Sequence, residues 1–157
     1  MFELVYEAFD VNGAKVPEVK RVTLDAGSNL DHFQSSFKPE GTTGPLTCGI
    51  GLKKVAGEQK QFKAERGSLV IWEKMEENQG MQGVAIIVDP KAFDKEAEDK
   101  KNNLLLVKAG PNNKVSYWAG FGWDKSGQFS DSEAWSAYVD HFAQGLASPL
   151  VVIVSTE

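Results

Sequence analysis

Three side chains of types suited to proton transfer stand out in predicted strands of this sequence: His32, Glu73 and Tyr117. An imidazole, a carboxylate or a phenol can remove or supply a proton when its pKa suits the reaction. Glu73 follows a tryptophan in a short apolar run. Its carboxylate is therefore either a general acid or base in an apolar pocket or a solvated group outside a sheet. We take all three residues as candidate catalytic residues.

His32 belongs to a predicted strand over residues 30–37. Alternation along a strand places His32, Gln34 and Ser36 on one face and the phenylalanines, including Phe33, on the other. If the phenylalanine face is core, the polar row either lines a binding cleft or faces water.

Aromatic residues and glycines gather in the run VSYWAGFGW at 115–123. Its composition predicts a β-strand, and Gly120 and Gly122 allow something to approach the backbone closely. Flat aromatic faces beside exposed backbone suit a sugar ring; alternatively, the rings are core and the glycines relieve crowding. Candidate substrate contacts are the aromatic Trp72, Trp118 and Trp123 and, for the carboxylate of a uronate, the basic Lys53 and Arg66.

Composition excludes several classes of function. Seventeen basic and 22 acidic residues give a net charge of −5, with no basic stripe of the kind that binds nucleic acid. The longest apolar run, residues 150–154, is too short to span a membrane. Cys48 is the single cysteine, so no disulfide and no thiolate zinc site is expected. Cofactors are otherwise left open: the acidic stretch 89–99 could hold calcium but lacks EF-hand spacing.

Most of the chain is predicted to form strands separated by turns. The turn dipeptide Asn12-Gly13 predicts a hairpin, and the run 104–108 is expected to pair with 115–123 across residues 110–113. The charged segment 91–103 is predicted as a solvated loop or frayed helical turn, and 150–154 as a strand inside a sheet. The other expected elements are strands at 2–9, 16–24, 30–37, 46–53, 68–74 and 80–88, a hairpin arm within 56–66, and a loop at 39–45.

One helix is predicted near the C-terminus, over residues 131–147. Ser130 and Glu133 have the spacing of a capping box. Trp135, Tyr138 and Phe142 then recur on one apolar face, which we expect to cover one sheet or one open end. Many strands with short turns and a single late helix indicate an all-β fold, an antiparallel β-sandwich with one C-terminal α-helix.

Several segments carry a family resemblance: VTLDAGSNLDHFQSSF at 22–37, GIGLKK at 49–54, and YWAGFGWDKSGQF from Tyr117, with SPLVV after the helix. They resemble the C-terminal half of an uncharacterised bacterial domain-of-unknown-function family found beside pectin- and other uronate-degrading enzymes. The resemblance implies a galactose-mutarotase-like supersandwich, whole or in part. It also implies that residues 1–157, expected to form one domain, are the C-terminal part of a longer periplasmic or secreted parent.

We therefore expect a carbohydrate-active protein that acts on acidic, uronate-containing oligo- or polysaccharides, as a lyase or a hydrolase. The alternatives are a non-catalytic carbohydrate-binding module and a structural half-domain that pairs with another subunit. His32, Tyr117 and Trp123 are expected to converge on one concave face. Because the first predicted strand begins at residue 2, it leaves a sheet edge that must be covered. We expect either a homodimer or cover by the segment 91–103.

Overall fold

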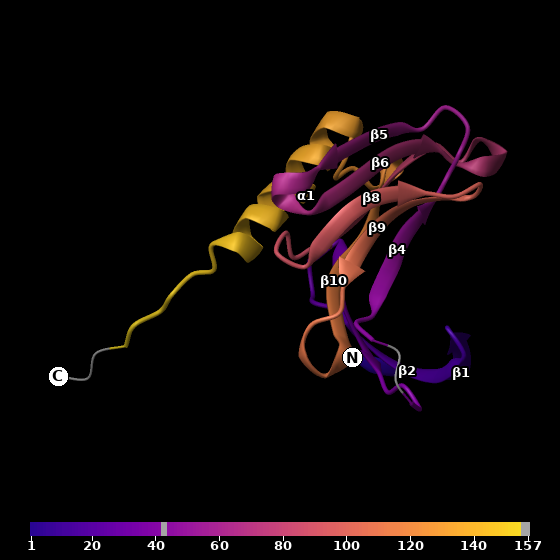
Figure 1. Ribbon diagram of the computed structural model, residues 1–157. Helices are drawn as coiled ribbons and strands as arrows, with labels where there is room; N and C mark the ends of the chain where they lie inside the picture. Colours follow the sequence, from indigo (N-terminus) through magenta and orange to yellow (C-terminus); the bar gives the residue numbers. More distant parts are fainter. Residues whose placement is uncertain (42–43, 155–157) are drawn as a thin grey trace.

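A computed structural model describes residues 1–41 and 44–154, which form two antiparallel β-sheets and one α-helix (Figure 1). The predicted all-β antiparallel sandwich with a C-terminal helix is therefore confirmed. The larger sheet has the order β1 (Phe2–Val11), β2 (Ala14–Thr23), β3 (Leu30–Phe37), β10 (Lys114–Trp123), β7 (Met81–Val88), β6 (Ser68–Lys74) and β5 (Gln59–Lys63). The smaller sheet has the order β4 (Thr47–Lys53), β9 (Asn102–Lys108) and β8 (Phe93–Glu98). Short 3₁₀ turns occur at Ala64–Arg66, Glu76–Asn78, Pro111–Asn113 and Asp124–Ser126.

The two sheets enclose one core between them. In β9 the alternating side chains of Leu105 and Val107 point inward and are fully buried, as the period of a strand requires. They pack with buried residues of the larger sheet, among them Leu69 and Ile86. This core occupies only part of the space between the sheets, a property on which the site described below depends.

The helix α1 (Ser132–Ala147) covers the outer face of the larger sheet (Figure 1). Trp135 and Val139 are fully buried there. The predicted capping box is wrong, because the helix is capped by Asp131, whose carboxylate accepts the backbone N–H of Ala134 at 2.9 Å. Ser130 instead donates its hydroxyl to Asp131.

The two glycines of the aromatic strand allow neighbouring groups to approach its backbone closely. A Cβ at Gly122 would lie 2.5 Å from the Phe129 ring and 2.9 Å from Trp135, and a Cβ at Gly120 would meet the backbone of Asn29. The predicted sugar trough floored by these glycines is therefore not found. Of the alternative, only the part about the glycines holds: they relieve crowding against neighbouring elements. The rings of the strand itself are not core, since Tyr117 and Trp118 are half-buried and Phe121 and Trp123 are exposed.

The segment 91–103 was predicted as a loop or frayed turn, which is wrong: it contains the edge strand β8. Charged residues occupy consecutive positions in this segment, so the sequence does not show the alternation of polar and apolar residues that is typical of a strand. In the structure the carboxylates of Asp94, Glu96 and Glu98 each pair with a lysine of a neighbouring element, at 2.8–2.9 Å. The polar arm predicted within 56–66 is confirmed as β5, which pairs with β6.

Two predictions about pairing are also wrong. Strands β9 and β10 lie in different sheets, because the turn at 110–113 carries the chain from one sheet to the other. Residues 150–154 form no strand, and their side chains are exposed. The predicted loop 39–45 contains residues 42 and 43, which lie outside the described residues.

Candidate functional site

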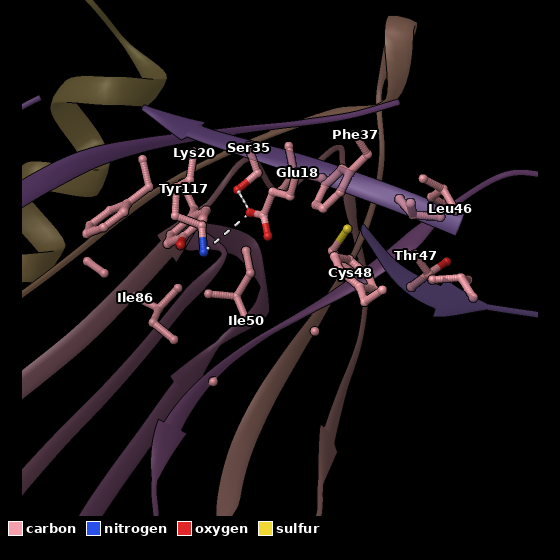
Figure 2. A pocket seen from close by; sticks show the side chains of 18 of the residues that line it. Glu18, Lys20, Ser35, Phe37, Leu46, Thr47, Cys48, Ile50, Ile86 and Tyr117 are labelled. Carbon is pink, nitrogen blue, oxygen red and sulfur yellow. Dashed lines mark hydrogen bonds and ion pairs between the residues drawn. The ribbon is translucent and has the colours of Figure 1, made fainter. Parts of the chain in front are cut away.

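A cleft of about 550 Å³ lies between β2, β3 and β10 of the larger sheet and β4 of the smaller one (Figure 2). It forms because the smaller sheet has only three strands and leaves part of its partner uncovered. Most of its wall is apolar, including Leu46, Ile50 and Ile86.

Four polar side chains meet inside this apolar wall. The carboxylate of Glu18 accepts the hydroxyl of Ser35 at 2.6 Å and lies 3.3 Å from the ammonium of Lys20. The same ammonium lies close enough to the phenol of Tyr117 for its charge to act on the pKa of that phenol. Figure 2 shows the four side chains pointing toward one another from three adjacent strands. The cleft therefore holds a paired cation and anion with a proton donor beside them.

Strand geometry positions this group. Glu18 and Lys20 are two residues apart on β2, so their side chains share a face. Lys20 lies directly opposite Ser35 of β3. Tyr117 lies opposite Phe33, and the two rings stack with centroids 4.9 Å apart. The site therefore follows from the register of β2, β3 and β10.

Burial and charge adjust the protonation of the site. Burial raises the pKa of the Tyr117 phenol above 10.0, although the nearby Lys20 opposes this shift. Burial lowers the pKa of Lys20, but Tyr117 and Glu18 outweigh this effect and the net pKa is raised. Burial also raises the pKa of the Cys48 thiol, at the edge of the cleft, to about 11. At neutral pH the phenol and the thiol are therefore protonated and the amine is charged.

The mouth of the cleft continues onto β1. Leu4 and Tyr6 pair with Lys20 and Glu18, so their side chains lie on the cleft face. A bulge between Tyr6 and Phe9 then shifts the alternation by one residue, so that Phe9 lines the cleft as well. The ammonium of Lys20 lies 5.0 Å from the centroid of the Tyr6 ring. Exposed apolar side chains thus adjoin the cation of the site.

His32 lies on the opposite face of the sheet from Tyr117. It pairs with Trp118, and the two rings stack with centroids 4.5 Å apart. The His32 imidazole also shares a hydrogen bond with the hydroxyl of Ser116 at 2.6 Å, and burial lowers its pKa. The expected convergence of His32, Tyr117 and Trp123 is therefore wrong, because adjacent residues of β10 point to opposite faces.

The other predicted residues are dispersed. Trp72 is buried beneath the helix. Glu73 points to the opposite face, as predicted, where it is 5% exposed and accepts the amide of Gln82 at 2.7 Å. Trp123 is 38% exposed and its indole donates to the carbonyl of Gln79 at 3.0 Å. Neither Glu73 nor Trp123 lines the cleft, so their predicted roles have no geometric support there.

Trp118 and Arg66 line a second recess of about 380 Å³ at the C-terminal end of the helix, together with Lys91. The negative end of a helix dipole disfavours a bound anion. Arg66 and Lys91 therefore lie where their charges favour the negative end of the helix, and this recess is less suited to the carboxylate of a ligand. Lys53 is exposed on the smaller sheet, away from both recesses.

Sequence reasoning missed Glu18, Lys20 and Ser35. The spacing of Glu18 and Lys20 in the strand predicted over 16–24 was the available signal, because it places opposite charges on one face. Nothing in the sequence indicated that this face would be enclosed.

Metal-ligating residues are not gathered anywhere in the described part of the chain: no three His, Cys, Asp or Glu side chains form a group. The acidic residues proposed for calcium are used in ion pairs and in the turn at Asp99. Within residues 1–41 and 44–154, no helix is long and apolar enough to cross a membrane.

Comparison with known proteins places the chain in a family. The family model described as "Domain of unknown function (DUF4861)" matches residues 1–152. The chain belongs to this family. It is 31% identical over 159 residues to "Uncharacterized protein P7" of Formosa agariphila, a match covering 98% of this chain and 39% of that protein. This DUF4861 chain thus spans about two fifths of the relative's length. No solved structure matches it significantly.

Proposed function

We propose that the cleft binds an acidic saccharide and that this chain is part of a carbohydrate-active protein. The supporting observation is the ammonium of Lys20, which lies in an apolar and aromatic cleft, paired with Glu18 and close to Tyr117. The carboxylate of a uronate would pair with the ammonium of Lys20, and its hydroxyls would hydrogen-bond to Glu18 and Tyr117. The C–H face of its ring would pack on the aromatic wall of the cleft. The resemblance to a family found beside uronate-degrading enzymes supports the same ligand class.

If the protein is an enzyme, the cleft favours a lyase over a hydrolase. Glu18 is the single carboxylate in the cleft lining, whereas most glycosidases use two. In an elimination, Lys20 would neutralise the uronate carboxylate while Glu18 removes the proton from the adjacent carbon. That electron pair forms the double bond as the neighbouring C–O bond breaks, and Tyr117, protonated at neutral pH, gives its proton to the leaving oxygen.

The alternative is a binding module without turnover. It is favoured by the contacts of Glu18, whose carboxylate is already held by Ser35 and Lys20. Such a module would use the cleft and not a flat tryptophan platform. Trp72 and Trp135 are buried, and Trp118 stacks on His32.

Titration calorimetry with oligogalacturonates and neutral galacto-oligosaccharides tests the proposal. We expect binding of the acidic ligand, and we expect Lys20→Met to lose it. Lys15→Met is the matched control, because Lys15 lies on the same strand with its side chain 59% exposed. Absence of binding to any acidic saccharide by the parent protein would contradict the proposal.

Ultraviolet absorbance of an unsaturated product separates the two forms of the proposal. If the protein is a lyase, the parent forms the product and Tyr117→Phe loses turnover while keeping affinity. A parent that binds without forming product is a binding module.

A further inference from the structure

We propose that the free edge of β1 accepts residues 150–154 of a second copy as an added strand, so that two copies exchange their C-terminal segments. This inference is independent of the proposed function. It rests on two unsatisfied features of the described structure, an open apolar sheet edge and an exposed strand-forming segment.

The edge is the outer side of β1, which has β2 as its one neighbour in the described sheet. Ten residues of backbone therefore present N–H and C=O groups without a strand partner on that side. Apolar side chains are exposed on both faces: Val5 is 78% exposed on one, and Leu4 and Tyr6 are 42% and 41% exposed on the other. The expected cover by the segment 91–103 is not found, because that segment forms β8 of the other sheet.

Composition sets β1 apart from the opposite edge of the same sheet. The outer strand there, β5, begins with the polar residues Gln59, Lys60 and Gln61, and Lys60 pairs with Glu96 of β8. Polar and charged edge strands resist pairing with other chains. Strand β1 is less protected: its charged residues are Glu3, Glu7 and Asp10, it has no lysine or proline, and five of its ten residues are exposed large apolar side chains.

The added strand is the segment Leu-Val-Val-Ile-Val at 150–154, whose side chains are 81–96% exposed. β-Branched residues favour strands, and apolar residues on both faces match an edge that is apolar on both faces. The segment has no charge to repel the acidic residues of β1. Added edge strands of this kind bind through backbone hydrogen bonds, with side chains supplying specificity.

Reach excludes pairing within one copy. The helix ends beside Trp118 of β10, where Leu146 and Ala147 line the second recess. Strand β1 lies three strands farther along the sheet, about 14 Å away at the usual strand spacing. The three residue steps from Ala147 to Leu150 span about 11 Å at most. In Figure 1 the segment also leads away from the sandwich on the side opposite β1. The partner is therefore a second copy.

Disulfide trapping between variants that each carry one added cysteine tests this arrangement. We expect Val5→Cys mixed with variants carrying a cysteine at one position of 150–154 to form cross-linked dimers at one or two of those positions. The native Cys48 does not interfere, because burial raises its pKa to about 11. Lys100→Cys, in an exposed turn, is the control and should give no cross-link with Val5→Cys. Light scattering should show twice the monomer mass for the parent protein and the monomer mass for a chain ending at Ser148.

Three outcomes would overturn the inference. Dimers of Val5→Cys alone would show that two β1 edges pair directly. An internal disulfide in a monomer of the double variant Val5→Cys/Val152→Cys would show that the segment docks on its own chain. A parent protein that stays monomeric at all concentrations, without cross-links, would show that the edge takes no second copy. The truncated chain should fold normally, because the exposed segment forms no strand and leaves no buried contact to lose.

Discussion

The two faces of the larger sheet differ in how they are covered, and adjacent residues of one strand show the difference. Trp118 of β10 points toward the helix, where Trp135 is completely buried. Tyr117 points into the cleft, where a smaller sheet leaves about 550 Å³ open and charged groups meet. The helix face thus carries packing energy, whereas the cleft face combines partial burial with groups that can contact a ligand. Substitutions on the two faces should therefore affect different properties.

The largest effect on stability is expected from Trp135→Ala. The residue is 0% exposed and touches Phe129 and Tyr138 through ring contacts at 5.0 and 5.6 Å. Denaturant unfolding should show a loss of about 3–5 kcal/mol. The matched change Phe121→Ala removes a ring that is 63% exposed on the cleft side, and should cost less than about 0.5 kcal/mol. Equal losses for the two variants would remove the distinction between the faces.

A smaller loss is expected where a single methyl group is added against the helix. A Cβ at Gly83 would lie 2.4 Å from the Trp135 ring. Gly83→Ala should therefore destabilise the fold by about 1–3 kcal/mol through overpacking. Gly49→Ala, in β4, is the control, because its Cβ would meet its closest neighbour, Leu106, at an ordinary 3.5 Å. If thermal unfolding shows no difference between the variants, the helix does not pack as tightly as described.

The last prediction concerns the reactivity of the Cys48 thiol and involves the smallest change in stability, because no residue is substituted. Burial raises the pKa of Cys48 from 9.0 to about 11, which lowers its thiolate fraction near pH 8 about a hundredfold. Since the thiolate is the reacting form, alkylation should be about a hundredfold slower than for a free thiol. The rate should rise about tenfold per pH unit up to pH 11 and then level off. A rate that levels off near pH 9 would show that the cleft wall is more open to water than described.

Local pattern determined much of this fold. Alternation in β3 correctly placed Phe37 in the core and His32 on the other face. The polar arm β5 and the helix were also predictable, because helix periodicity and turn chemistry act over a few residues. Strand β8 was missed since its stabilising ion pairs join it to residues distant in sequence.

The candidate site depended on information that no local pattern contains. Tyr117 was identified from its type and its aromatic neighbours, and the structure places it in the cleft. Glu18 and Lys20 could have been paired from their spacing, but the enclosure of that pair depends on the smaller sheet covering one end of the larger. The catalytic or binding roles of these residues remain predictions.

What the sequence determined by itself is most of the strands, the late helix and the alternation of side chains between two faces, because these follow from periods of two and 3.6 residues. Tertiary structure decided which faces meet. It separated β9 from β10 into two sheets, turned Gly122 of β10 against Phe129 and Trp135, and moved His32 away from Tyr117. Long-range strand order has no local signature, because it is fixed by how apolar faces from distant segments bury one another.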